Sequence, residues 1–234
     1  MQAIREAERR GKVVKMHRFL VGRTARVAAG TATAVIAGGV AYGAWAGSAA
    51  GSPASVSGQL QVDASQVSAV ETTFSHAIGA VQAFGSPPAA YQQSALASVR
   101  AKKQVPALSA SMHSQLVASG KAAVTKYFAG KQASVEDKTL NDAMALDANP
   151  HIVNLGSGVS KVKFLNVAVA GPRATVDADV TVWAKSQIRQ TSTGPWVLAD
   201  PVNIVEYTAT LTLTPAGTWQ VTSLTGSFVP GYGP

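Results

Sequence analysis

The sequence predicts an α+β protein in which a transmembrane helix precedes several helices and a four-stranded antiparallel sheet. Three observations predict it. Residues 27–50 carry no charge and follow a basic segment. Apolar residues then recur at steps of three and four as far as residue 148, a spacing typical of helices. From residue 160 they alternate with polar residues, a pattern typical of strands with one buried face.

The predicted helix over 27–50 is long enough to cross a bilayer, which takes about 20 mostly apolar residues. Its many Ala and Gly residues make insertion marginal. Gly39 and Gly43 form a small-xxx-small pair that favours helix dimerisation. Tyr42 and Trp45 lie toward the far end, where aromatic rings prefer the interface. Two alternatives stay open: a cleaved signal peptide, with Ala44-Trp45-Ala46 as its cleavage site, and a buried helix of a soluble protein.

The net charge of +8 is concentrated in the first 26 residues. By the positive-inside rule, a basic segment before a span stays in the cytoplasm, so we expect residues 51–234 outside the cell membrane. The same segment suits anionic lipid. Because the remainder is nearly neutral, we expect no nucleic-acid partner for the exported part. The basic residues of this tail are Arg5, Arg9, Arg10, Lys12, Lys15, Arg18, Arg23 and Arg26.

The absence of cysteine excludes a disulfide framework and any thiolate metal site. The expected organisation is a cytoplasmic tail (1–26), the membrane helix (27–50), a Gly/Ser/Ala-rich linker (51–65), a helical stalk (66–104), an α+β domain (105–228) and a short tail (229–234).

The first helix outside the membrane is predicted over 66–84, where one apolar stripe recurs at helical spacing. The Gly85–Pro88 segment ends it. The stripe either packs on the domain or pairs with another subunit, and we assign it as the candidate interaction surface. Its members are Val67, Val70, Phe74, Ile78, Val81 and Phe84.

Three more helices are predicted before the sheet. They cover residues 89–104, 107–129, ending at Gly130, and 134–148, with Ser134 as N-cap. A Gly156–Gly158 loop then leads into strands at 161–170, 173–185, 202–214 and 218–228. Short connections make sequential strands antiparallel neighbours, and the helices are expected to cover the apolar face.

The helix end Lys126–Gly130 and the strands Ala174–Trp183, Val205–Thr214 and Trp219–Leu224 carry a family resemblance. In order and length, residues 107–228 resemble the cone-shaped domain of the nuclear-transport-factor-two-like (cystatin-like) superfamily. With one N-terminal span, the chain is similar to inner-membrane assembly subunits of type IV secretion and conjugation machines, and to Mce-associated membrane proteins. The resemblance implies a curved sheet and a cone-shaped domain. It rests on topology, with no signature motif.

Enzymes of this superfamily use a cone pocket with an acid or a His–Asp pair. Asp177 and Asp179 alternate on one strand, about 6–7 Å apart. Their threonine neighbours favour a solvated face over a proton-sharing pair or a cation site. No second His or Cys stands at ligand spacing from His151, so no zinc site is predicted. The candidates considered were His113, His151, Asp147, Asp177, Asp179 and Glu206. None is assigned a catalytic, cofactor-binding or metal-binding role, and the chain is predicted not to be an enzyme.

Two functions follow. The first is a non-enzymatic scaffold or assembly subunit of an envelope secretion, conjugation or transport complex, a homo-oligomer that also contacts other envelope proteins. The alternative is an extracytoplasmic small-molecule or lipid binder, with an enzyme less favoured. A binder needs an apolar cavity near Phe164, Tyr127 and Trp183 with one buried titratable group. Trp183, Trp196 and Trp219 either line the mouth of the cone or pack in its core.

Overall fold

The computed structural model describes residues 64–232. The basic tail, the membrane helix with Gly39, Tyr42, Gly43 and Trp45, and most of the linker lie outside the described residues. Among residues 64–232, no helix has the length and hydropathy that a membrane crossing requires.

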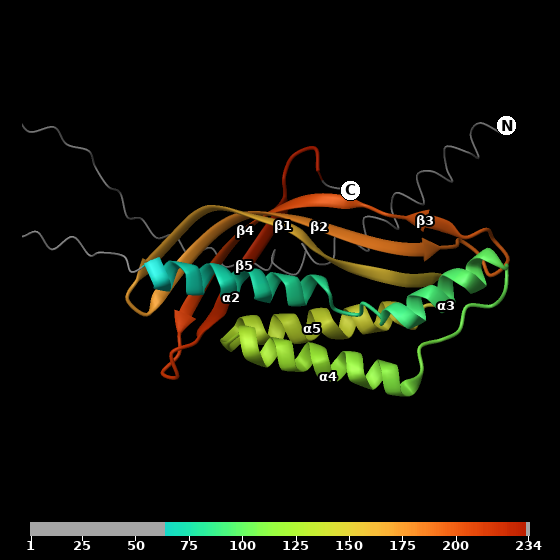
Figure 1. Cartoon of the computed structure of the whole chain (residues 1–234), viewed down its shortest axis with the longest axis horizontal. Helices are drawn as coiled ribbons and strands as arrows, with labels where there is room; N and C mark the ends of the chain where they lie inside the picture. The colour runs from blue at the N-terminus through green and yellow to red at the C-terminus, as the bar shows by residue number, and fades with distance from the viewer. Residues whose placement is uncertain (1–63, 233–234) are drawn as a thin grey trace, which may run out of the picture.

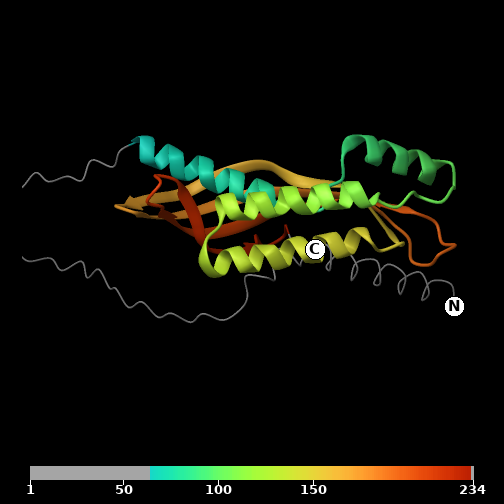
Figure 2. The same cartoon turned by 90° about the horizontal axis from the view of Figure 1, so that it is seen from below.

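The first half of the described chain is helical, with α2 (Ala64–Gln82), α3 (Ala89–Arg100), α4 (Ala110–Tyr127) and α5 (Gly130–Asp147). The second half is one antiparallel sheet, so the predicted α+β order is confirmed. In Figure 1, α2 and α5 lie under the sheet, and α4 packs on both on the side away from it. Figure 2 shows α4 and α5 as neighbours, with α3 set apart at one end of the molecule.

The sheet has five strands rather than the predicted four: β1 (Ile152–Ala170), β2 (Arg173–Ile188), β3 (Val197–Ala199), β4 (Val202–Leu213) and β5 (Trp219–Phe228). The order is β1-β2-β4-β5, and β3 also pairs with β2. The extra strand arises because β2 runs beyond the last residue that β4 pairs, Trp183. Its end, Ser186–Ile188, extends beyond the predicted limit of this strand at residue 185 and pairs with Val197–Ala199, which no predicted strand included.

The first strand begins nine residues earlier than the expected Lys161, and the predicted Gly156–Gly158 loop lies inside it. The sequence suggested a loop because glycine usually interrupts strands. Here the glycines allow an irregular strand instead: the register shifts between Asn154 and Gly156, where Gly156 has φ +127°. The ring of Trp183 lies over both glycines and would approach within 3.2 Å of a Cβ on Gly158.

The last helix also begins earlier than expected, at Gly130 rather than after Ser134. Only Phe128 and Ala129 separate it from α4. This connection is fixed to the edge of the sheet, since the Ala129 amide donates to the Val221 carbonyl (3.0 Å) and Phe128 forms a parallel bridge with Val221. As a result, α4 and α5 form an antiparallel pair anchored on β5.

The apolar stripe of α2 lies in the main core, against the inner face of the sheet. Phe74 and Ile78 are at most 1% exposed and share this core with Val176 and Leu211, and the Phe74 ring packs edge-to-face on Phe164 (5.8 Å). Val70, Val81 and Phe84 are buried as well, and only Val67 is half-buried. The stripe thus packs on its own domain, the first of the two alternatives, and as an interaction surface it offers little accessible area.

The expected stalk over 66–104 is therefore divided between two cores. Whereas α2 belongs to the main core, α3 packs through a small separate cluster of Ala95 with Val153 and Leu155 of β1. Few apolar contacts hold α3, so its local stability is expected to be lower than that of α2.

Candidate functional site

Three of the four carboxylates that the sequence singled out, Asp177, Asp179 and Glu206, lie on the outer face of the sheet, as the solvated-face interpretation predicted. Thr208 donates a 2.8 Å hydrogen bond to Asp177, and Lys163 lies 3.7 Å from Asp179. Glu206 is exposed opposite Asp179 on β4. Exposed pairs of this kind contribute little free energy of folding. Asp177 and Asp179 thus have partners on the surface, and none of the three carboxylates of the sheet faces the interior.

The histidines are dispersed. His113 is exposed on α4, and His76 is exposed on α2 with its ring 6.0 Å from that of Tyr127. His151 lies in the turn before β1, where its Nδ1 is buried with no hydrogen-bond partner. No group of three or more His, Asp or Glu side chains within residues 64–232 is placed to hold a metal ion.

The aromatic residues expected around a cavity lie in separate places. Trp219 is buried in the core and donates to Gln66 (3.3 Å), whereas Trp196 lies under the Arg189 guanidinium (4.6 Å) at the other end of the sheet. Trp183 covers the glycines of β1, and Phe164 packs on α2. They do not form a shared cone mouth.

Polar groups do meet in the interior, between α2, α5 and the sheet. The Gln82 amide of α2 donates a 2.9 Å hydrogen bond to the hydroxyl of Tyr207 on β4. On α5, the Gln132 amide donates to the Glu136 carboxylate (2.6 Å), and its carbonyl oxygen accepts from the Leu224 amide of β5 (3.0 Å). We call Gln82, Gln132, Glu136 and Tyr207 the interior polar group.

The electrostatics of the interior polar group favour its neutral forms. Burial raises the pKa of Glu136, and hydrogen bonds from Gln132 and Thr139 offset part of this effect. Burial also raises the pKa of Tyr207, the Gln82 hydrogen bond lowers it, and the charge of Glu136 raises it further. Side chains in such a setting are suited to proton exchange or to recognition of one polar ligand atom, but here they bind one another.

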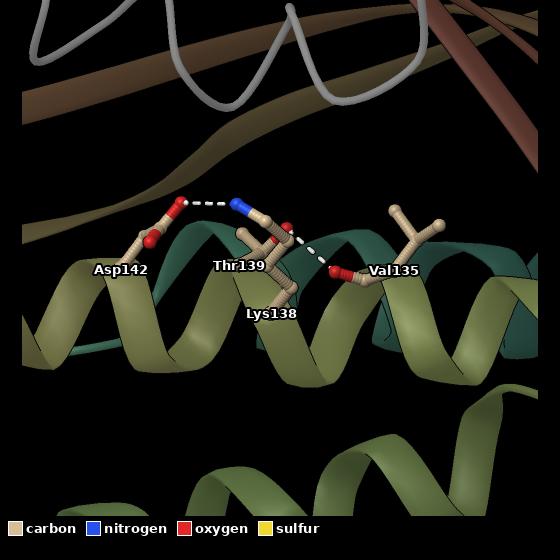
Figure 3. A network of polar contacts seen from close by, with 4 residues as sticks. All are labelled: Val135, Lys138, Thr139 and Asp142. Atoms are coloured by element: carbon tan, nitrogen blue, oxygen red, sulfur yellow. Dashed lines mark hydrogen bonds and ion pairs between the residues drawn. The ribbon is translucent and has the colours of Figure 1, made fainter. Parts of the chain in front are cut away.

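The two sides of α5 differ sharply. Figure 3 shows its outer side, where Lys138 and Asp142 form an exposed ion pair one turn apart (3.3 Å). Thr139 donates back to the Val135 carbonyl (3.1 Å) and is buried next to Glu136. The inner side therefore carries Glu136 into the core, while the outer side keeps its charges in water.

A second polar cluster forms at the end of α5, where Asp147 meets the turn after α2. Asp147 Oδ2 is fully buried and has no hydrogen-bond partner. A Cβ atom added to Gly85 would lie 3.2 Å from this oxygen. The Gly85 carbonyl accepts a hydrogen bond from the Asn154 side-chain amide (2.8 Å). Burial raises the pKa of Asp147 to about 7, and the Asn154 side chain lowers it only in part. Burial and the charge of Asp147 raise the pKa of Tyr91.

The sequence interpretation named Asp147 as a candidate but missed Glu136, because it read Glu136 as a first-turn residue of a helix starting near Ser134. A signal was available: Gln132, Glu136, Leu140 and Met144 recur every four residues and are all buried. Two polar members inside an otherwise apolar stripe indicate a polar interior. The other two members of the interior polar group, Gln82 and Tyr207, bond each other across 125 residues, and no local pattern connects them.

No model of a known protein family matches the chain, and no curated protein matches it in sequence. Several solved structures are similar in fold. The intermembrane-space region of the chloroplast protein ARC6 is 16% identical with a TM-score of 0.37, over 58% of this chain and 95% of that one. An IcmL-like type IV secretion system protein from Legionella pneumophila is 14% identical (TM-score 0.33, 62% and 95%).

An NTF2-like protein involved in plasmid conjugation is 12% identical with a TM-score of 0.31, over 53% of this chain and 43% of that one. These similarities concern the fold alone.

Proposed function

We propose that the chain is a non-enzymatic, single-pass membrane protein that acts as a scaffold or assembly subunit of a cell-envelope secretion, conjugation or transport complex. Its N-terminus lies in the cytoplasm and its α+β domain outside the membrane. The anchor is supported by the uncharged run at 27–50 behind eight basic residues. Its partners are the bilayer, other envelope proteins and further copies of the chain.

The observation that carries the non-enzymatic part is the pairing of the interior polar group. Gln132 bonds Glu136, and Gln82 bonds Tyr207, so these polar side chains are directed toward one another. The carboxylates Asp177, Asp179 and Glu206 face solvent on the other side of the sheet. Catalysis needs an acid or base within reach of a bound substrate, and this arrangement supports a structural role for these groups.

Topology is tested first. Intact cells are treated with external protease, and membranes are separated from cytosol. The proposal expects the full-length chain in the membrane fraction, with the α+β domain degraded from outside. Full-length chain in the cytosol, or a domain protected from protease in cells that have been stripped of their outer layers, contradicts it.

Assembly is tested by photocrosslinking in intact membranes. Probes are placed at the exposed apolar side chains Val197, Leu198 and Val202, which are 49–59% exposed, and at the exposed polar position Ser223 for comparison. The proposal expects discrete crosslinked species containing envelope proteins or a second copy. Only a monomer from all probe positions, together with a monomer in detergent extracts, counts against a scaffold.

A binder is the second candidate, and one observation favours it: Glu136, whose pKa is raised by burial, is a carboxyl within a largely apolar core. It predicts saturable binding of an apolar fluorescent probe that Glu136→Gln alters and that Asp142→Asn, on the outer side of α5, leaves unchanged. Equal binding by both variants rejects this second candidate.

A further inference from the structure

A run of basic residues without a carboxylate marks the helical part of the described domain. Between Glu71 and Glu136 the sequence contains six basic residues and no carboxylate. All six are exposed, and no carboxylate within residues 64–232 lies within ion-pair distance of any of them. We call them the basic face: Arg100, Lys102, Lys103, Lys121, Lys126 and Lys131.

The basic face is carried by the helices: α4 and α5 lie on the side away from the outer face of the sheet, and α3 lies at one end of the molecule (Figures 1 and 2). Lys121 and Lys126 project from α4, which is on the side of the molecule away from the sheet (Figure 1). Lys131 follows at the start of α5, and the other three basic residues are at the end of α3 and in the loop after it. The outer face of the sheet carries Asp177, Asp179 and Glu206.

The exposed surface of α4 beside Lys121 and Lys126 carries several short side chains. Its exposed residues include Ser111, Ser114, Ala118, Ala122 and Thr125. Short side chains let the lysine ammonium groups reach a planar surface together. Five of the six basic residues are lysines, which act as hydrated point charges, and this suits a diffuse anionic surface better than bidentate recognition of single carboxylates.

We propose that the basic face docks on the anionic headgroups of the bilayer in which the chain is anchored, so that the domain lies with α4 toward the lipid and its sheet away from it. This inference depends on the proposed membrane anchor. Residues 51–63 then limit the distance between bilayer and domain to about 45 Å, because an extended chain spans at most about 3.5 Å per residue. Such tethering raises the effective concentration of lipid at the basic face.

Charge complementarity favours lipid over the outer sheet face of a second copy, where carboxylates and lysines are mixed. The carboxylates of that face are already partly neutralised, since Asp179 pairs with Lys163 and Asp177 accepts from Thr208. The basic face has no such neutralisation within the described residues. Lipid phosphates supply a counter-charge at any lateral position, which an array of lysines extending over two helices requires.

The test uses the full-length chain in nanodiscs, one chain per disc, of phosphatidylcholine alone or with phosphatidylglycerol. The protein has no cysteine, so a single introduced cysteine accepts a fluorophore at one site. Ala118→Cys places it on the exposed side of α4, and Ser223→Cys places it on the outer face of the sheet. A spin label on the lipid headgroup quenches a fluorophore near the bilayer.

The expected result is strong quenching at position 118 in anionic discs, weak quenching at 223, and loss of the difference at about 0.5 M salt, where the Debye length is below about 5 Å. Equal quenching at the two positions, or no dependence on lipid charge, overturns the proposal.

Two matched triple variants separate the basic face from net charge. Lys121→Gln/Lys126→Gln/Lys131→Gln is expected to reduce the docked fraction by about tenfold or more, given the contribution of each basic residue at an anionic surface. Lys161→Gln/Lys163→Gln/Lys185→Gln removes the same charge from β1 and β2 and is expected to leave quenching at 118 unchanged. Equal effects of the two variants overturn the assignment to α4.

Two further outcomes are distinguished in the same experiment. One outcome is that quenching is absent in single-chain discs and that position 118 becomes shielded only with two chains per disc. If Asp177→Asn/Glu206→Gln abolishes this shielding, the occupant of the basic face is a second copy and the lipid proposal is wrong. If the chain leaves neutral discs in high salt, the anchor itself fails. A chain that stays in neutral discs but shows no quenching difference retains the anchor and rejects only the docking.

Discussion

Replacing Asp147 by Asn tests whether a buried, unpartnered carboxylate oxygen destabilises the domain. The carboxyl ends α5 beneath Gly85, and its Oδ2 has neither water contact nor a donor. The pKa rises from an ordinary 3.8 to about 7. At about 1.4 kcal/mol per pKa unit, this rise in the pKa corresponds to about 4 kcal/mol. The free energy of unfolding is lower by this amount at a pH where Asp147 is ionised in the folded protein.

The sign follows from proton binding. Between pH 3.8 and about 7 the folded state keeps the Asp147 proton, whereas the unfolded chain releases it. The folded state thus binds more protons, and its stability falls as pH rises through this window. Asp147→Asn is neutral at every pH, so we expect no gain below about pH 4 and a gain that approaches 4 kcal/mol above pH 7.

The assay is urea unfolding of residues 51–234 by tryptophan fluorescence at intervals from pH 4 to pH 9. Asp142→Asn is the control, because Asp142 lies on the same helix in an exposed ion pair with Lys138 and should change stability by about 0.5 kcal/mol or less. A gain from Asp147→Asn that is the same at pH 4 and pH 8, or a loss of stability above pH 7, refutes the reasoning.

Three further predictions concern the core and are read from the same unfolding curves. Phe74→Ala should cost about 3–5 kcal/mol, because the ring is fully buried, and an unchanged midpoint would mean that the α2 stripe is not core. Gly120→Ala should cost about 1–3 kcal/mol, since the new methyl group would lie 2.5 Å from Leu140, and no loss would mean that α4 moves freely on α5. Tyr207→Phe should cost about 1–3 kcal/mol by leaving the buried Gln82 amide without its acceptor, and a stabilised variant would contradict that pairing.

Most of the sheet was predictable from sequence because strands with one buried face have a strict period. Alternation from Ala174 to Val182 fixed which side of β2 is buried, and the observed pairing of Asp177 with Thr208 on the opposite side agrees with it. The first and last residues of the strands were harder to predict from the sequence. The early start of β1 depends on Gly156 adopting φ +127° next to the ring of Trp183, a contact between residues that no local pattern links.

The α2 stripe shows why a correct helix prediction does not decide which surface a helix uses. Periodicity placed Phe74 and Ile78 on one side, but whether that side meets its own sheet or another subunit depends on how much apolar sheet is left to cover. Four long strands present an inner face with Val176, Val180 and Leu211, all fully buried, and α2 and α5 are the helices available to shield it. The apolar face of the sheet is formed by residues about a hundred positions further along the chain. Its extent is therefore known only once the strands are paired. Any role in assembly therefore belongs to surfaces that stay exposed after the core is closed, among them the apolar side chains Val197, Leu198 and Val202.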